Sequence, residues 1–218
     1  RGVDLSYFLP VRQVAEMEKF MNLCKTLYVW ATGLRFLPCW MICRNCSRCR
    51  EDLARWHGIL RGNEAVSFPA FADLMTFFPE YRSLVYARIK VRRSWLVRFL
   101  KLLGKPLPLL SIAAENIKGG LYIQHGFATI IAPRKIGRNC WINQGVTIGY
   151  TNAIDCPTLG DDITVGAGAK ILGNCVIGDR VIVGANAVVV KDVPSDCTVV
   201  GVPAYIIRRN GKRVFEKL

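Results

Sequence analysis

The sequence predicts an α+β fold in which N-terminal helices precede a parallel β-helix built from hexapeptide repeats. Apolar residues recur at helical spacing as far as position 104. Prolines at 106 and 108 then interrupt the chain, and beyond them the apolar period changes to six. An amphipathic helix cannot keep a period of six in register, whereas short strands separated by turns can.

The segment 11–104 is predicted to be a set of helices. Ser67 before Phe68-Pro69 predicts a helix start, and Pro79 predicts the end of that helix and the start of the next, which continues to Arg88. Near the N-terminus, one predicted helical face carries Val14, Met17, Met21, Cys24 and Tyr28. A last apolar stripe, ended by Gly104, carries Leu96, Phe99, Leu100 and Leu103.

The composition is that of a folded, basic chain. Hydrophobic residues make up 51% and charged residues 21%, which excludes intrinsic disorder. The net charge is +14, of which residues 1–110 supply +10. Such a surface attracts nucleic acid, anionic lipid or phosphorylated ligands. Because no nucleic-acid-binding motif is present, we expect no nucleic-acid partner, and we expect a phosphate-bearing cofactor or membrane-surface contact through the basic N-terminal half.

The apolar stretch from Thr26 to Cys43 is interrupted by Arg35 and Pro38. A bilayer span needs about 20 apolar residues nearly free of charge, so a buried or membrane-surface helix is the better interpretation.

Four cysteines cluster in the N-terminal half. Their spacing is that of an iron–sulfur or zinc site, but it also matches one face of a helix, and free cysteine is often buried. The cluster consists of Cys39, Cys43, Cys46 and Cys49. We favour helix packing and expect no metal site. The nine cysteines lie in a chain without secretory features, which predicts reduced thiols in the cytoplasm.

The repeat itself extends over most of the C-terminal half. Its aliphatic positions are Ile136, Ile142, Ile148, Leu159, Val165, Ile171, Ile177, Val183 and Val189. Glycine usually follows the aliphatic residue, and a small apolar residue stands four positions after it. The aliphatic side chain is expected to point into a shaft. At the corners of the shaft, glycine permits a backbone conformation that a Cβ would strain. We divide the chain into a helical domain, 1–110, a β-helix domain, 111–207, and a basic C-terminal tail, 208–218.

The repeat is broken once. Ile148 and Leu159 are eleven residues apart instead of twelve, and the segment from Tyr150 to Pro157 lacks the pattern. This segment is predicted to leave the shaft as a loop, and loops on a regular scaffold often carry function.

Candidates for a general base are few, because the chain has only two histidines. His57 lies among the helices and is expected to be an ordinary surface or packing residue. His125 lies in the first coils of the β-helix and is the only side chain of the repeat region that ordinarily titrates near neutrality. We therefore favour His125 as the functional histidine.

Specific motifs resemble the serine O-acetyltransferase family of the hexapeptide-repeat acyltransferase superfamily. They are the run from Gly166 to Asn174, the segment Gly201-Val202-Pro203-Ala204, the residues around His125, and Gln144 to Gly149. The resemblance covers roughly residues 80–210. It implies a left-handed β-helix, acetyl-CoA as co-substrate, and a homotrimer with its site between neighbouring β-helices. Helical segments of such trimers can pair them into a dimer of trimers.

Carried over to this sequence, the resemblance implies that His125 deprotonates a small-molecule hydroxyl acceptor, which attacks acetyl-CoA. The cofactor would contact Gly149, Ala167, Gly168, Ala185 and Lys191, with Arg208, Arg209 and Lys212 as further candidates for its phosphates. Gln124 and Cys156 would lie at the acceptor.

Three departures leave the acceptor open. Gln124 replaces the Asp that precedes the family's catalytic histidine, and Cys156 replaces a second histidine before the loop proline. The Asp that orients the imidazole falls at Leu110, with Glu115 as the nearest upstream carboxylate. The acceptor is therefore serine, or a sugar hydroxyl of a capsular or cell-surface polysaccharide precursor; the remaining alternative is an inactive β-helix scaffold.

Overall fold

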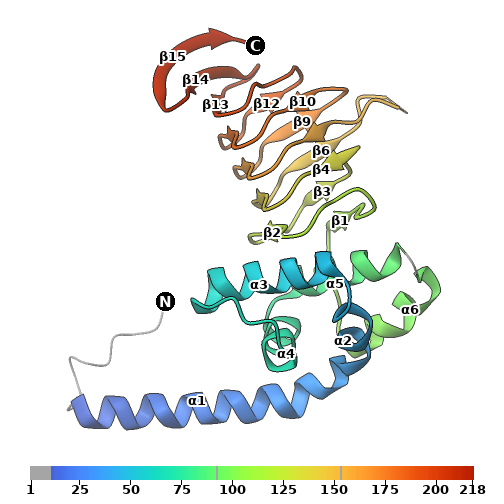
Figure 1. Ribbon diagram of the computed structural model, residues 1–218, viewed down its shortest axis with the longest axis vertical. Helices are drawn as coiled ribbons and strands as arrows, with labels where there is room; N and C mark the ends of the chain where they lie inside the picture. Colours follow the sequence, from blue (N-terminus) through green and yellow to red (C-terminus); the bar gives the residue numbers. More distant parts are fainter. Residues whose placement is uncertain (1–10, 92, 153) are drawn as a thin grey trace.

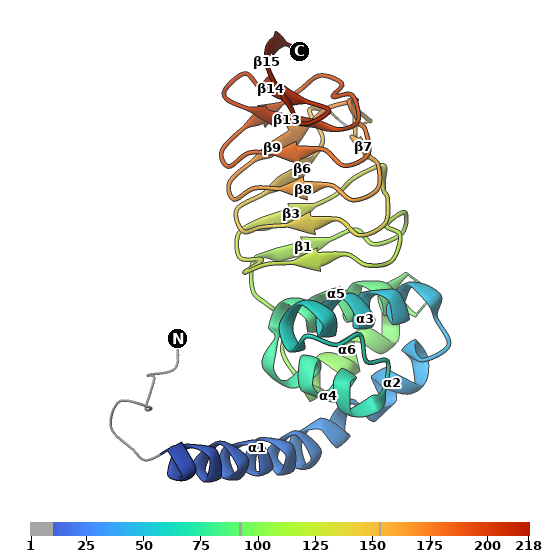
Figure 2. The ribbon, with the colours of Figure 1, turned by 60° about the vertical axis from the view of Figure 1, so that its left-hand side comes forward.

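The computed structural model describes the backbone of residues 11–91, 93–152 and 154–218, without the side chains of residues 11–15 and Glu18. It contains a unit of helices on which a β-helix stands, with the C-terminus at the far end (Figures 1 and 2). The predicted change from helices to strands falls between Leu103 and Leu110. No described helix is long and apolar enough to cross a membrane.

The helical unit confirms the predicted helix starts and ends. Ser67 caps α4, where its hydroxyl accepts a hydrogen bond from the backbone N–H of Ala70, and Pro79 is the first residue of α5. The helices are α1 (Val11–Gly33), the 3-10 turn η2 (Leu34–Phe36), α2 (Leu37–Cys43), α3 (Ser47–Arg61), α4 (Phe68–Phe77), α5 (Pro79–Lys90) and α6 (Ser94–Leu103).

The longest helix, α1, packs through a different face from the predicted one. Val29 is buried, and a Cβ on Gly33 would lie 2.7 Å from that of Ala72 in α4. Met21 and Tyr28, on the face expected to be apolar, are exposed, and the side chain of Val14 lies outside the described residues.

The β-helix has three sheets, because each coil contributes a strand to each face. The five-stranded sheet has the order β1-β3-β6-β9-β12, with β1 (Leu110–Ile112), β3 (Thr129–Ile131), β6 (Thr147–Gly149), β9 (Lys170–Leu172) and β12 (Val188–Val189). The three-stranded sheet contains β4 (Lys135–Ile136), β7 (Thr158–Leu159) and β10 (Val176–Ile177).

The seven-stranded sheet has the order β15-β14-β13-β11-β8-β5-β2. Its parallel strands are β2 (Tyr122–Ile123), β5 (Trp141–Ile142), β8 (Thr164–Val165), β11 (Ile182–Val183) and β13 (Cys197–Val200). The strands β14 (Tyr205–Arg209) and β15 (Lys212–Lys217) add to β13 in antiparallel fashion. Residues 208–217 therefore belong to an ordered hairpin, where the sequence predicts a tail.

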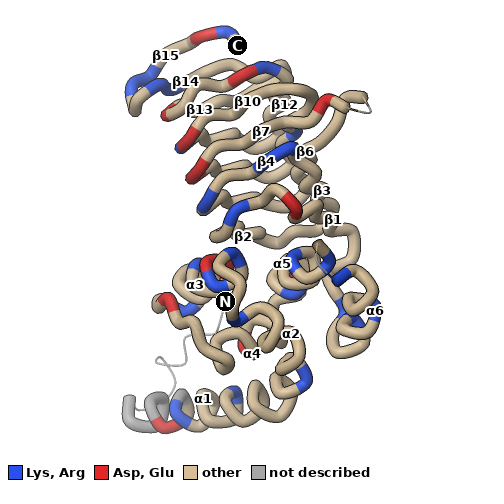
Figure 3. Tube along the Cα trace, turned by 45° about the vertical axis from the view of Figure 1, so that its right-hand side comes forward, with Lys and Arg blue, Asp and Glu red and all other residues tan. Residues whose placement is uncertain are grey.

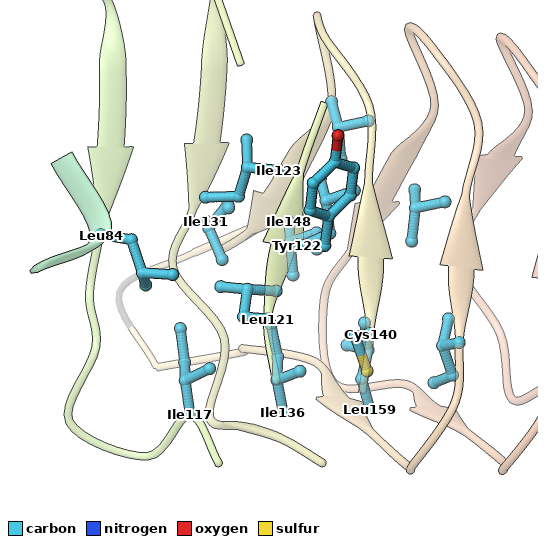
Figure 4. Packing of buried hydrophobic residues seen from close by; sticks show 14 of the residues in the cluster. Leu84, Ile117, Leu121, Tyr122, Ile123, Ile131, Ile136, Cys140, Ile148 and Leu159 are labelled. Carbon is cyan, nitrogen blue, oxygen red and sulfur yellow. The ribbon is translucent and has the colours of Figure 1, made fainter. Parts of the chain in front are cut away.

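The repeat residues fill the shaft as predicted. Ile148 pairs with Ile171, which in turn pairs with Val189. Figure 4 shows Ile136, Ile148 and Leu159 among the buried side chains of the shaft. All nine predicted aliphatic positions are no more than 1% exposed. Burying one such side chain contributes about 1.5–3 kcal/mol, so the stacked columns supply the main driving force for this half.

A buried ion pair fastens the helices to the first coil. The guanidinium of Arg88 in α5 donates to Asp52 of α3 through Nε at 2.9 Å and Nη2 at 3.2 Å. The same guanidinium donates to the carbonyls of Ile117 and Lys118, while Asp52 accepts from the N–H of Leu121. Burial raises the pKa of Asp52, and Arg88 opposes that rise. This connection lies four residues before His125.

We expect Asp52→Asn to destabilise the protein by about 3–5 kcal/mol, because it leaves the buried Arg88 charge without a counterion. Chemical denaturation followed by circular dichroism measures the loss. The matched control is Asp196→Asn, which removes an equally bidentate but exposed pair with Arg180 and should change stability little. Equal losses in the two variants would contradict the role given to burial.

Candidate active site

The predicted base lies at the corner where the chain passes from the seven-stranded to the five-stranded sheet. We call this turn of every coil the first corner. His125 follows β2, and its φ of 60° is in the left-handed region that few non-glycine residues adopt. Its side chain is exposed and forms no hydrogen bond with any residue that the structure describes. Non-glycine residues held in this conformation are found disproportionately at functional sites.

The first corner is wider in the His125 coil than in the next one. Ile123 pairs with Ile142, and Ile131 pairs with Ile148, so the His125 coil has two more residues between these positions. The N–H of Phe127 donates to the carbonyl of His125, which tightens the turn. The extra length projects His125 from the shaft.

Gly126 allows a close contact with the helical unit. A Cβ at this position would lie 2.9 Å from Cγ2 of Ile123, 3.1 Å from Cδ2 of Leu110 and 3.3 Å from Cγ of Glu80. The backbone next to His125 is therefore packed against β1 and the first turn of α5. Sequence reasoning did not find Glu80, because no periodic pattern relates residue 80 to residue 126.

Three predicted cofactor residues continue the first corner in later coils. The N–H of Gly168 donates to the carbonyl of Gln144, and the N–H of Asn186 donates to the carbonyl of Ala167. Ala167, Gly168 and Ala185 therefore stack above Gln144 in one column. Gly168 has a φ of 74°, and a Cβ there would lie 2.1 Å from Oδ1 of Asn186. The column thus presents little side-chain bulk.

Gly149 and Cys156 lie at the opposite edge of the five-stranded sheet, which we call the second corner. Gly149 ends β6, and the described residues of the loop, 150–152 and 154–157, leave the shaft there (Figure 1). Cys156 is buried, and its thiol donates to the carbonyl of Ala132 at 3.1 Å. A hydrogen bond with Cys156 raises the pKa of Tyr150. One chain therefore does not bring Gly149 or Cys156 together with His125.

Lys191 also follows a strand of the five-stranded sheet, near the end of the shaft. Its Nζ donates to the backbone oxygen of Leu218 at 2.7 Å, and it lines a cavity of about 520 Å³ together with Tyr205, Phe215 and Lys217. Arg209 is engaged by Glu216, which raises the pKa of the arginine. Arg208 and Lys212 are exposed on the hairpin.

Gln124 has a specific partner. The indole N–H of Trp141 donates to Oε1 of Gln124 at 3.1 Å. Because an indole nitrogen can only donate, the amide oxygen must be the atom that faces it. The two N–H groups of the amide are left to face other ligands.

The sequence leaves the carboxylate that would orient His125 open, with Glu115 as the nearest one upstream. Glu115 precedes Ile117, which pairs with Ile136 beside the three-stranded sheet, away from the first corner. Within one chain, Glu115 is thus not positioned to contact His125. His57 lies in α3 with Nδ1 at 2.8 Å from the carbonyl of Asn63.

The cysteine cluster lies on two helices instead of one. Cys39 and Cys43 belong to α2, whereas Cys46 caps α3 and Cys49 lies within it. Burial raises the pKa of Cys39 to about 12, and a hydrogen bond with Cys43 together with burial raises that of Cys49. The described residues include no group of three or more side chains that could hold a metal ion.

Comparisons with known proteins agree with this geometry. Residues 157–191 match the family described as bacterial transferase hexapeptide (six repeats). The chain is 40% identical over 152 residues to a serine acetyltransferase of Synechococcus elongatus, covering 65% of this chain and 62% of the relative. It is 44% identical over 98 residues to the serine acetyltransferase of Staphylococcus xylosus, covering 43% of this chain and 45% of the relative. The chain thus spans less than two thirds of either relative.

Among solved structures, the serine acetyltransferase of Neisseria gonorrhoeae in complex with serine superposes with a TM-score of 0.61. It is 29% identical, and the match covers 78% of this chain and 72% of that one. A soybean serine acetyltransferase complexed with serine gives 0.60 at 25% identity, with coverages of 79% and 74%. By its repeats, its sequence and its fold, the chain resembles serine acetyltransferases and other proteins with hexapeptide repeats.

Proposed function

We propose that the protein transfers acetyl from acetyl-CoA to a hydroxyl group, with His125 as the general base. The observation that carries the proposal is an exposed histidine held in a left-handed conformation at the widened first corner. It stands at the start of the column of small residues that includes Ala167 and Ala185. Relatives named serine acetyltransferases support this reaction class.

The proposed reaction moves one proton from the acceptor to the departing thiolate through His125. The imidazole of His125 takes the proton of the acceptor hydroxyl while that oxygen attacks the thioester carbonyl. The tetrahedral oxyanion then collapses, the carbon–sulfur bond breaks, and the imidazolium returns the proton to the departing thiolate of CoA. The small residues of the column would let the pantetheine arm lie close to the backbone.

We propose a homotrimer, which the separation of the two corners supports. The loop 150–157 and the base lie at opposite edges of the five-stranded sheet, so they can share a site only across an interface between copies. A homotrimer in which the second corner of one β-helix faces the first corner of its neighbour would complete the site.

We expect His125→Ala to lower the turnover number about 100-fold or more, because general-base catalysis is lost. The loss of thioester absorbance measures the reaction without interference from the exposed thiol of Cys24. His57→Ala is the matched control and should retain wild-type turnover. A folded His125→Ala variant with wild-type turnover would rule out this role.

The acceptor named by the relatives is serine, but Gln124 favours a second candidate, a sugar hydroxyl. A carboxylate next to the base would pair with the ammonium group of serine. Gln124 carries no charge, and Trp141 already occupies its amide oxygen, so it offers hydrogen-bond donors instead. Donors of this kind suit the oxygens of an uncharged polyol.

Replacing Gln124 by Asp should raise kcat/KM for serine about tenfold, since the charge can then pair with the ammonium. Assays with serine and with acetylatable sugars, for the wild type, Gln124→Asp and Gln124→Asn, give the comparison. Saturable wild-type turnover with serine and none with sugars would refute the sugar candidate.

We further propose that α6 contacts an anionic membrane surface. Trp95, Phe99 and Leu102 lie on one face of α6 and are 66%, 61% and 83% exposed. The exposed Arg98 and Lys101 flank that face, and residues 81–114 contain no Asp or Glu (Figure 3). Aromatic and aliphatic side chains beside basic ones are typical of helices that lie in the bilayer interface.

The triple variant Trp95→Gln, Phe99→Gln, Leu102→Gln should bind vesicles containing anionic lipid at least tenfold more weakly than the wild type. Vesicle sedimentation measures this binding. Its matched control, Phe20→Gln, Leu23→Gln, Leu27→Gln, removes equally exposed apolar residues from α1 and should leave binding unchanged. Wild-type binding by the α6 variant, or a loss of self-association without any vesicle binding, would overturn the membrane assignment.

A further inference from the structure

A half-buried carboxylate lies against the residue that follows the proposed base in the chain. Glu80 is the second residue of α5, and its side chain is half-buried. It forms no hydrogen bond or ion pair with any residue that the structure describes. A glutamate in the first turn of a helix stabilises the helix dipole. That role does not require contact with the β-helix, which Glu80 nevertheless makes.

Glu80 interacts with residues on both sides of His125 in the sequence. Its Cγ packs over the backbone of Gly126, the residue that follows the base. Its charge also acts on Tyr122, three residues before the base: burial raises the pKa of this tyrosine, and Glu80 adds to the increase. The side chain of Glu80 therefore lies against the turn that carries His125.

An apolar side chain from β1 also lies against Gly126. Cδ2 of Leu110 and Cγ of Glu80 both approach the position that a Cβ on Gly126 would take. Leu110 cannot accept a hydrogen bond from an imidazole. The carboxylate available at this corner thus comes from the helical unit, not from the first strand of the shaft.

The other groups that could compete for this carboxylate are engaged or neutral. Arg82, two residues after Glu80, donates to the carbonyls of Met75, Thr76 and Lys105. Tyr122 stacks against Trp141 with ring centroids 4.6 Å apart. Among the described donors of this corner, the hydroxyl of Tyr122 and the amide of Gln124 are neutral, whereas His125 gains a positive charge when it acts as a base.

We propose that Glu80 is the positioning residue of the site, accepting a hydrogen bond from one nitrogen of His125 so that the other faces the acceptor hydroxyl. The inference rests on the proposed acetyl transfer. A carboxylate in this place fixes the imidazole tautomer and stabilises the imidazolium that forms when the base takes its proton. The helical unit is thereby part of the active site, and not only a support for the shaft.

The test compares Glu80→Gln and Glu80→Asp with Glu115→Gln. The last variant removes the upstream carboxylate of the β-helix that is nearest to His125 in the sequence. Glu80→Gln should lower kcat about tenfold or more, whereas Glu115→Gln should have no effect and Glu80→Asp should recover part of the rate. Loss of a negative charge beside His125 disfavours the imidazolium, so the acid limb of the kcat/KM profile should move to lower pH by about one unit. A merely structural role would not move that limb.

A second readout does not depend on activity. The chain has two histidines, so the His57→Ala variant assigns the His125 ring resonance by proton NMR. When that resonance is titrated in the Glu80→Gln variant, its midpoint should lie at lower pH than in the wild type. If Glu80→Gln produces this shift but the wild type acetylates no acceptor, the proposed function fails while the positioning contact stands.

Two outcomes would overturn the inference. One is an unchanged NMR titration and pH profile in folded Glu80→Gln protein. The other is a rise in the acceptor KM alone, with kcat and the acid limb unchanged, which would place Glu80 on the acceptor and not on His125.

Discussion

The buried pair of Arg88 and Asp52 is the constraint on which the rest of the molecule depends. A β-helix can begin at any coil, and nothing within the repeat determines how its first coil meets the helices. By binding the carbonyls of Ile117 and Lys118 and the N–H of Leu121, the pair fixes that coil against α3 and α5. The indole of Trp56 adds a hydrogen bond to the carbonyl of Leu121. The turn that follows, with His125, therefore meets α5 in one orientation.

Beyond that junction, regular stacking restricts where the chain can vary. Val165 pairs with Val183 and Ile171 with Val189, so an undisturbed coil takes eighteen residues. Extra residues can be accommodated only where the backbone leaves the ladders. The chain uses this freedom at the His125 turn and in the loop 150–157, at opposite edges of one sheet. The scaffold thereby separates the residues that hold the shaft together from those that can change with the substrate.

Sequence reasoning succeeded where the structure is periodic or local. The six-residue period placed all nine aliphatic side chains in the shaft, and capping and proline positions located α4 and α5. It failed where contacts join distant segments. The sequence offered Glu115 only as the nearest upstream carboxylate and left the partner of His125 open, while the fold brings Glu80 of α5 to the first corner. The cysteine spacing suggested one helix, yet the chain turns between Cys43 and Cys46. The hairpin at residues 205–217 carries no repeat that could have predicted it.

That hairpin changes what the end of the shaft can do. A stack of parallel strands ends in unpaired N–H and C=O groups, which would serve as a template for the first coil of another molecule. The strands β14 and β15 reverse direction on top of β13, and exposed Lys212, Arg213 and Lys217 stand on the outermost strand. Helices cover the opposite end. With both ends of the shaft covered, head-to-tail stacking of molecules into fibres is disfavoured.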